Sequence, residues 1–265
     1  MTNQLPHQLP NHEIPRFPNA GTIVLVLALD TTTRAGSVAL VEDDRVVVER
    51  AGDPTRSHAE RLPGEILTLL SDAGLGTSDV DLFAVASGPG LFTGLRIGIA
   101  TLQGFAFVHG KKVATVSALE AFAHLASPDL APGGTLGVWM DAQRRDVFSA
   151  LYQIASFDVF DLGRLIEVEA PHVGAPVDTA RRWLRLTAPG TPRVFAGDGA
   201  GLFAESLHAS FGECRIVPPV ALAGAIGRLA VANSLAGLAM NPADVRPLYV
   251  RRPDAEIERE RRAGL

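Results

Sequence analysis

The stretch of sequence that decides the fold is LALDTTTRAGSVAL, residues 27–40, in which an apolar strand ends in aspartate and a second strand follows a short turn. A similar stretch begins 111 positions later as VWMDAQRRDVFSAL, residues 138–151. Each stretch predicts an antiparallel hairpin whose first strand ends in aspartate, at Asp30 and at Asp141. Two such units predict an α/β protein with a duplicated β-β-β-α-β-α lobe, in which mixed β-sheets are flanked by helices.

Turn residues and hydrophobic periodicity divide the chain into four parts. We expect a Pro-rich disordered extension over 1–20, a first lobe over 21–116, a second lobe over 117–250 and a mixed-charge tail over 251–265. The predicted strands are 22–30, 35–41, 45–50, 82–87, 112–116, 135–141, 147–153 and 193–196. The predicted helices are 57–73, 92–108, 117–126, 178–186 and 222–236. Ser57 and Glu60 have the spacing of a capping box at the start of the first helix.

The composition limits the possible classes of function. Hydrophobic residues make up 47% of the 265 and charged residues 20%, which is ordinary for a globular protein. A net charge of −5 and a pI near 5.8 argue against binding nucleic acid through the chain's own basic surface. The single cysteine, Cys214, excludes an internal disulfide. The apolar run 22–29 is too short to span a membrane and lacks signal-peptide features, so we expect a cytoplasmic protein.

Two turns of the first lobe have the composition of phosphate-binding loops. Asp30 can hold a hydrated divalent ion, while the threonines from Thr31 onward can bind phosphate oxygens; alternatively, these threonines only satisfy backbone groups of the turn. Gly88 and Gly90 lie just before the helix 92–108, whose N-terminus attracts anions; alternatively, they only permit a sharp turn. A third strand–glycine–helix junction, residues 195–200, is suited to lie against an adenosine.

Other features argue against catalysis by this chain. The turn of the second hairpin, residues 142–146, has no glycine or threonine and contains two bulky arginines. Histidines are scattered singly, and no His-x-x-x-His pair occurs. Two hypotheses follow: a protein that supports a partner enzyme, or an autonomous kinase or ATPase that uses Asp30, Thr31, Gly90 and Asp141.

The helix predicted over 92–108 is apolar on every side, with Arg96 as its single charged residue. Such a helix must be covered on every side. The small residues Gly94, Gly98 and Thr101 would let a helix of another protein approach closely. The alternative is that neighbouring helices of the same chain cover it.

Several stretches together resemble the bacterial TsaB family, also called YeaZ. They are residues 27–40, SGPGLFTGLRIGIA at 87–100, residues 138–152 and PLYVR at 247–251. The resemblance implies an actin/hexokinase-like fold. It also implies a non-catalytic dimerisation subunit that binds TsaD. With TsaE, that complex transfers threonylcarbamoyl to the adenosine beside the anticodon of tRNA.

The resemblance further implies which residues matter. Where TsaD has a metal-binding His-x-x-x-His pair, this chain has His58 alone, so we expect no cofactor, no metal and no catalytic residue. Asp30, Thr31, Gly88 and Gly90 would then be vestigial phosphate-clamp positions. We expect helices 57–73 and 92–108 to bind TsaD, with a homodimer possible in isolation and tRNA contacted through the complex. The predicted interface residues are Leu62, Ile66, Leu95, Gly98, Thr101 and Leu102.

Overall fold

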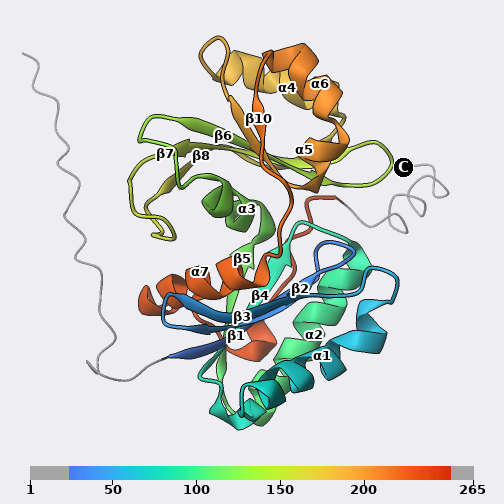
Figure 1. Ribbon diagram of the computed structural model, residues 1–265, viewed down its shortest axis with the longest axis vertical. Helices are drawn as coiled ribbons and strands as arrows, with labels where there is room; N and C mark the ends of the chain where they lie inside the picture. Colours follow the sequence, from blue (N-terminus) through green and yellow to red (C-terminus); the bar gives the residue numbers. More distant parts are fainter. Residues whose placement is uncertain (1–23, 252–265) are drawn as a thin grey trace, which may run out of the picture.

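The computed structural model describes residues 24–251, which form two lobes, each with one five-stranded sheet (Figure 1). The strands of the first sheet lie in the order β3-β2-β1-β4-β5. The antiparallel neighbours are β1 (Leu25–Asp30), β2 (Ser37–Glu42) and β3 (Arg45–Ala51). On the other side of β1 lie two parallel strands, β4 (Leu82–Gly88) and β5 (Lys112–Ser117).

The second sheet repeats this topology. Its order, read from one edge, is β8-β7-β6-β9-β10. The antiparallel strands are β6 (Thr135–Asp141), β7 (Val147–Ile154) and β8 (Leu165–Gly174). The parallel strands are β9 (Val194–Ala196) and β10 (Arg215–Ile216). Because order and direction agree strand by strand, the predicted duplication of mixed sheets is confirmed.

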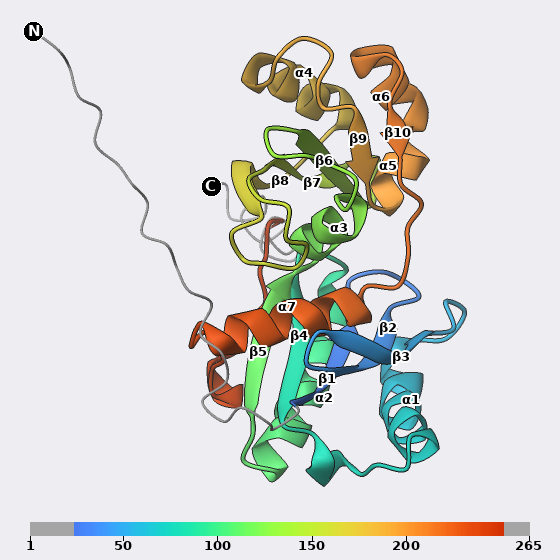
Figure 2. The ribbon, with the colours of Figure 1, turned by 60° about the vertical axis from the view of Figure 1, so that its left-hand side comes forward.

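Helices cover both faces of each sheet (Figures 1 and 2). The outer face of the first sheet carries α1 (His58–Asp72) and α2 (Phe92–Val108). The outer face of the second sheet carries α4 (Pro176–Leu186), α5 (Asp198–Leu202) and α6 (Ala204–Phe211). Between the sheets lie α3 (Ala118–Ala126) and α7 (Ala223–Leu235). Short 3₁₀ turns occupy Thr77–Asp79 and Pro242–Asp244.

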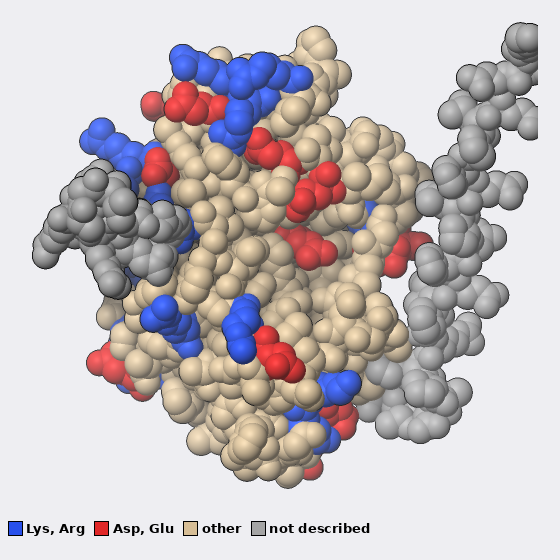
Figure 3. All heavy atoms as spheres, turned by 180° about the vertical axis from the view of Figure 1, so that it is seen from behind, with Lys and Arg blue, Asp and Glu red and all other residues tan. Residues whose placement is uncertain are grey.

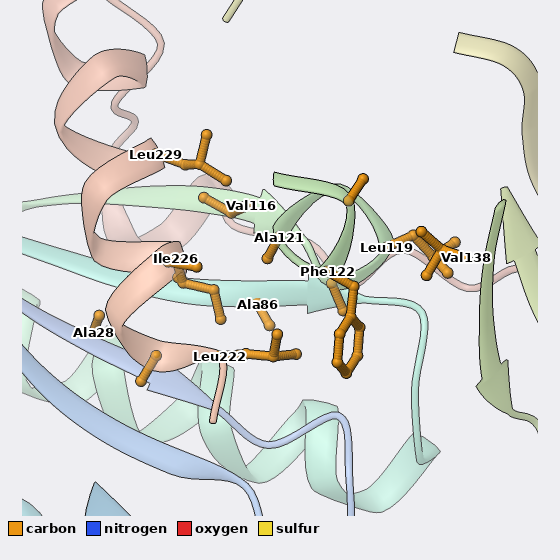
Figure 4. Packing of buried hydrophobic residues seen from close by; sticks show 14 of the residues in the cluster. Ala28, Ala86, Val116, Leu119, Ala121, Phe122, Val138, Leu222, Ile226 and Leu229 are labelled. Atoms are coloured by element: carbon orange, nitrogen blue, oxygen red, sulfur yellow. The ribbon is translucent and has the colours of Figure 1, made fainter. Parts of the chain in front are cut away.

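One hydrophobic cluster runs from the first sheet through α3 and α7 into the second sheet. Figure 4 shows Leu222, Ile226 and Leu229, at the start of α7 and along it, on the side of α7 that faces Ala86 and Val116 of the first sheet and Phe122 of α3. Burying each such Leu or Ile side chain contributes roughly 2 kcal/mol. The two lobes therefore share a continuous core.

The placement of α7 corrects the predicted lobe boundary. The second lobe was expected to include everything from 117 to 250, yet α7 packs on all five strands of the first sheet through contacts with β1 to β5. The physical reason is its apolar surface: Ala223, Gly227 and Ala230 are small and buried, which lets the helix lie close to the sheet. The chain thus returns to the first lobe after β10.

Some of the remaining features agree with the sequence-based expectations, and others are new. The capping box is confirmed, since the Ser57 N–H donates to the Glu60 carboxylate at 3.0 Å. The structure adds β8, β10, α5 and α6 to the predicted elements; in β8 the apolar Ile166 and Val168 are exposed while Glu169 is half-buried, so the strand has no regular apolar alternation. The predicted extension 1–20 and residues 252–265 of the predicted tail lie outside the described residues. Within 24–251, no helix is both long and apolar enough to cross a bilayer.

Candidate functional site

The first hairpin turn, residues 31–36 between β1 and β2, closes on the carboxylate of Asp30. One carboxylate oxygen accepts the Thr32 N–H at 2.8 Å and the Thr32 hydroxyl at 2.6 Å, and the other accepts the Thr33 hydroxyl at 3.4 Å. Asp30 is 2% exposed, and this burial raises its pKa, which the Thr32 hydrogen bonds partly oppose. Because these bonds all go to its own turn, a phosphate-contacting role for Asp30 and Thr31 stays a prediction.

The start of α2 packs directly on this turn. The Leu91 N–H donates to the Thr32 carbonyl at 3.1 Å. A Cβ atom on Gly94 would overlap the Thr31 carbonyl oxygen, and one on Gly98 would overlap the Thr31 hydroxyl. The expectation that Gly94 and Gly98 admit a helix of another protein is therefore wrong, since they admit the turn of their own lobe.

The glycine-rich loop before α2 is equally close-packed. A Cβ atom on Gly90 would lie 2.5 Å from Thr32 Cβ, and one on Gly88 would lie 2.8 Å from the Leu248 carbonyl oxygen. Both glycines thus permit close approach of other backbone segments, which supports the structural alternative left open above. Their role as phosphate contacts stays a prediction.

Two side chains of α1 hold the turn from its other side. His58 Nε2 donates to the Thr33 carbonyl at 3.0 Å, and Arg61 Nη2 donates to His58 Nδ1 at 2.8 Å. Arg61 also bonds the Ala35 carbonyl and pairs with Glu65 at 2.6 Å. Burial, and then the charge of Arg61, lower the pKa of His58. Sequence analysis missed Arg61, although its spacing from His58 and Glu65 places all three on neighbouring positions of one helix.

The second hairpin turn, residues 142–146, is exposed at its centre, and other contacts stabilise it. Gln143, Arg144 and Arg145 are consecutive residues with φ of 61°, 55° and 66°, the left-handed region that disfavours side chains. The Asp141 carboxylate accepts the Gln143 N–H at 2.8 Å and its side-chain amide at 2.6 Å. Arg251 donates to the Ala142 carbonyl at 2.6 Å, so a residue from the far end of the described chain supports the turn.

Three aspartates approach one another between the lobes. Asp198 Oδ1 accepts the Asp141 N–H and the Gly199 N–H, each at 3.0 Å. Burial raises the pKa of Asp198, and the charge of Asp141 raises it further. The charge of Asp198 likewise raises the pKa of Asp30. These residues are near enough to repel, but among residues 24–251 no group of three or more His, Cys, Asp or Glu side chains could hold a metal ion.

The predicted interface residues mostly face inward. Five of the six are buried in the first lobe: Leu62, Ile66, Leu95, Gly98 and Leu102. The sixth, Thr101, is half-buried and donates its hydroxyl to the Ile97 carbonyl at 2.7 Å. The expected outward orientation is wrong for the five buried residues, because they supply the side of each helix that packs on the lobe's own core.

A different face of α2 is exposed. Its exposed residues recur every three or four positions, at Phe92, Arg96, Ala100, Gly104 and Phe107, which we call the α2 stripe. Phe107 is 78% exposed. The neighbouring helix α1 exposes Gly64 and Leu67. A Cβ atom on Gly64 or Gly104 would meet no atom within 4 Å, so both positions lie open on the surface.

The chain is similar to named bacterial proteins. TsaB of Bacillus subtilis, a tRNA threonylcarbamoyladenosine biosynthesis protein, is 31% identical over 128 residues, which are 48% of this chain and 55% of that protein. The solved structure of YeaZ from Pseudomonas aeruginosa superposes with a TM-score of 0.67 at 27% identity, covering 85% of this chain and 99% of that one. The chain belongs to the TsaB/YeaZ family.

Two further matches cover most of the sequence. The model of the family described as "TsaD: tRNA N6-adenosine threonylcarbamoyltransferase" matches residues 52–258. Rv3421c, an uncharacterised protein of Mycobacterium tuberculosis, is 34% identical over 239 residues, which are 88% of this chain and 95% of that protein. The fold of this family member is that of the solved YeaZ structures, with two lobes that each contain a mixed five-stranded sheet flanked by helices.

Proposed function

We propose that this family member acts in tRNA threonylcarbamoyladenosine biosynthesis as a non-catalytic subunit that binds TsaD. Relatives from Bacillus subtilis, Haemophilus influenzae and Escherichia coli are named TsaB proteins of that pathway. The match to the TsaD family model supports a common fold for the two subunits. Such a pair can meet through equivalent surfaces, as identical subunits do in a two-fold dimer.

The observation that carries this proposal is the exposed face of α1 and α2. Phe107 is 78% exposed, its neighbour Val108 77% and Leu67 of α1 53%. Large apolar side chains that are exposed on two packed helices favour contact with another protein over contact with water. Gly64 and Gly104 have no side chain to keep another helix away. A helix pair of TsaD packed on this face would therefore bury apolar surface at short interhelical distance.

The remaining partners follow from the same proposal. TsaE would join the complex, and tRNA would be contacted through the assembly. Without TsaD, the same face on a second copy of the chain is the natural substitute, which would give a homodimer. The site of action would be the cytoplasm, where tRNA is modified.

The closed first turn weighs against the alternative of an autonomous ATPase or kinase. Asp30 already accepts three hydrogen bonds from its own turn and is 2% exposed. Coordination of a hydrated cation would require breaking these bonds in a buried site. Calorimetric titration of the isolated chain with Mg-ATP tests this alternative, because tight binding with turnover would contradict a non-catalytic role.

Co-purification with TsaD of the same organism tests the proposal, and failure to form a complex at any nucleotide concentration would overturn it. Ala100→Glu and Gly104→Glu place a carboxylate on the α2 stripe, where docking would remove it from water. We expect each to weaken binding about 100-fold, which corresponds to about 2.7 kcal/mol. Ala209→Glu is the matched control, since Ala209 is exposed on α6 of the other lobe. Equal loss in all three variants would contradict docking through this face.

A further inference from the structure

The last described residues, 247–251, form a segment that we call the C-terminal strap. It follows the first lobe, where the Leu248 N–H donates to the Ser87 carbonyl at 2.7 Å. It then reaches the second lobe, where Arg251 donates to the Ala142 carbonyl and pairs with Asp146. In Figure 1 the strap is the red segment between the two sheets. Because both of its ends are anchored, the residues between them are held in place.

One exposed residue of the strap, Tyr249, completes a cluster at the start of α2. Its ring stacks on Phe92 with centroids 5.1 Å apart, and its hydroxyl accepts a hydrogen bond from Arg96 Nε at 2.8 Å. The Arg96 guanidinium lies 3.9 Å from the centroid of the Phe92 ring. Phe92 is 37% exposed and Tyr249 38%. Two aromatic rings and an arginine, contributed by segments far apart in sequence, thus form one surface.

Within the described residues, the guanidinium of Arg96 is oriented but not neutralised. Its Nε bonds Tyr249, while no carboxylate among residues 24–251 forms an ion pair with it. The two Nη groups are therefore available for a carboxylate, which arginine can bind through two parallel hydrogen bonds. Stacking on Phe92 restricts the rotamers of Arg96 in advance, which lowers the entropy lost when a partner binds.

We propose that Phe92, Arg96 and Tyr249 together form the contact point at the N-terminal end of the α2 stripe for the partner that docks there, and that Arg96 binds a carboxylate of that partner. This inference rests on the proposed function, because Phe92 and Arg96 form the N-terminal end of the α2 stripe and Tyr249 packs against them. Tyrosine and arginine are the residue types that dominate binding energy at interfaces. As the single charge of an otherwise apolar stripe, Arg96 would also fix the register of the docked helices. The strap makes this contact depend on residues outside the helix pair.

Affinity of the full chain for TsaD tests the inference. Arg96→Ala should weaken binding by about 10- to 100-fold, and Arg96→Lys by nearly as much, because an ammonium cannot form the two parallel bonds. Tyr249→Phe keeps the ring stacking but removes the acceptor that orients Arg96, so we expect a loss of about 3- to 10-fold. Arg185→Ala is the control, since Arg185 is exposed on α4 of the other lobe. Melting curves of each variant show whether the first lobe stays folded.

The outcomes separate this inference from the proposed function. If Ala100→Glu abolishes binding while Arg96→Ala stays within two-fold of wild type, the contact point is wrong and TsaD docking stands. If wild type itself does not bind TsaD, both fail. A carboxylate contact also predicts that the dependence of affinity on salt is smaller in Arg96→Ala than in wild type. An unchanged salt dependence together with weakened binding would show that Arg96 acts through packing, which contradicts the carboxylate.

Discussion

The two hairpin turns occupy equivalent places in the duplicated lobes but are stabilised in opposite ways. In the first lobe, six residues separate the paired Asp30 and Ser37, and the turn is packed between α1 and α2. In the second lobe, five residues separate Asp141 from Val147, and three consecutive residues there have positive φ on the surface. The topology of a duplicated unit is therefore retained while its turns diverge. The first turn has become a packing element that positions the helices of the proposed docking face.

The largest difference between the turns should appear when each aspartate is removed. Asp30→Ala leaves the Thr32 N–H and hydroxyl without acceptors in a buried site, and we expect a loss of about 3 kcal/mol in the free energy of unfolding. Asp141→Ala should cost about 1 kcal/mol, because Gln143 is exposed and can bond water instead. Urea denaturation of both variants measures the difference.

Asp30→Asn is the control for charge. It keeps an oxygen acceptor and removes the buried carboxylate whose pKa burial raises, so it should cost clearly less than Asp30→Ala. Equal losses in Asp30→Ala and Asp141→Ala would remove the distinction between a packed and an exposed turn.

The next largest effect compares two glycines of the same helix. Gly98→Ala forces the Thr31 side chain away from α2, and we expect a loss of about 1–3 kcal/mol from overpacking. Gly104→Ala adds a methyl group where no atom lies within 4 Å, so it should stabilise by up to about 1 kcal/mol through helix propensity. Thermal melting of the two variants should therefore shift in opposite directions. Equal shifts would mean that the first turn does not lie against Gly98 in solution.

These glycines also show what could be predicted from sequence. The duplicated topology could be predicted, because the strand–aspartate–hairpin pattern is repeated at Asp30 and Asp141. The docking face could not, because α2 is apolar on all sides and its periodicity does not tell which side turns inward. That side is decided by Thr31, whose turn lies against Gly94 and Gly98 only after the lobe has folded.

The order of elements along the chain was misleading for α7. Its place after the predicted strand 193–196 assigns it to the second lobe, yet its small buried residues pack on the first sheet. Nothing in local propensity encodes which of two similar sheets an apolar helix covers. Arg61 and Tyr249 were missed for a related reason: each acts through contacts with segments distant in sequence, Ala35 and Arg96 respectively.

Acid should destabilise the protein through two buried histidines. The expected effect is smaller than those of the Asp30 and Gly98 substitutions. Burial, with smaller contributions from Arg164 and Arg228, lowers the pKa of His124 to about 4, and its Nδ1 accepts the Phe160 N–H. A lowered pKa means that the folded state favours neutral histidine, so this contribution to stability is complete above about pH 6.5 and is lost as pH falls towards 4. Between pH 7.5 and 5.5, we expect His124 to account for a loss of about 1 kcal/mol.

His58, which contacts the first turn from α1, should add to this loss. Its Nδ1 accepts a bond from Arg61, so protonation would place an N–H against a guanidinium. The second turn contains no histidine and should not respond. Unfolding free energies at pH 7.5 and 5.5 for wild type, His124→Gln and His58→Gln test this, since each variant should lose less stability on acidification than wild type. A variant with the wild-type pH dependence would show that its histidine is protonated equally in the folded and unfolded states.

The smallest predicted effect has opposite signs in the two turns. Arg145 has φ of 66°, where a side chain costs roughly 1 kcal/mol, so Arg145→Gly should stabilise by about 0.5–1 kcal/mol once the extra entropy of unfolded glycine is counted. At Gly36 of the first turn φ is 60°, but a Cβ atom there would also lie 2.5 Å from the Asp30 carbonyl oxygen. Gly36→Ala should therefore destabilise, by both strain and overlap. Denaturation of the two variants under the same conditions shows whether the free energy of unfolding rises in Arg145→Gly and falls in Gly36→Ala. If Arg145→Gly instead destabilises, the exposed arginine contributes more through its side chain than its backbone costs, and the second turn is selected for that side chain.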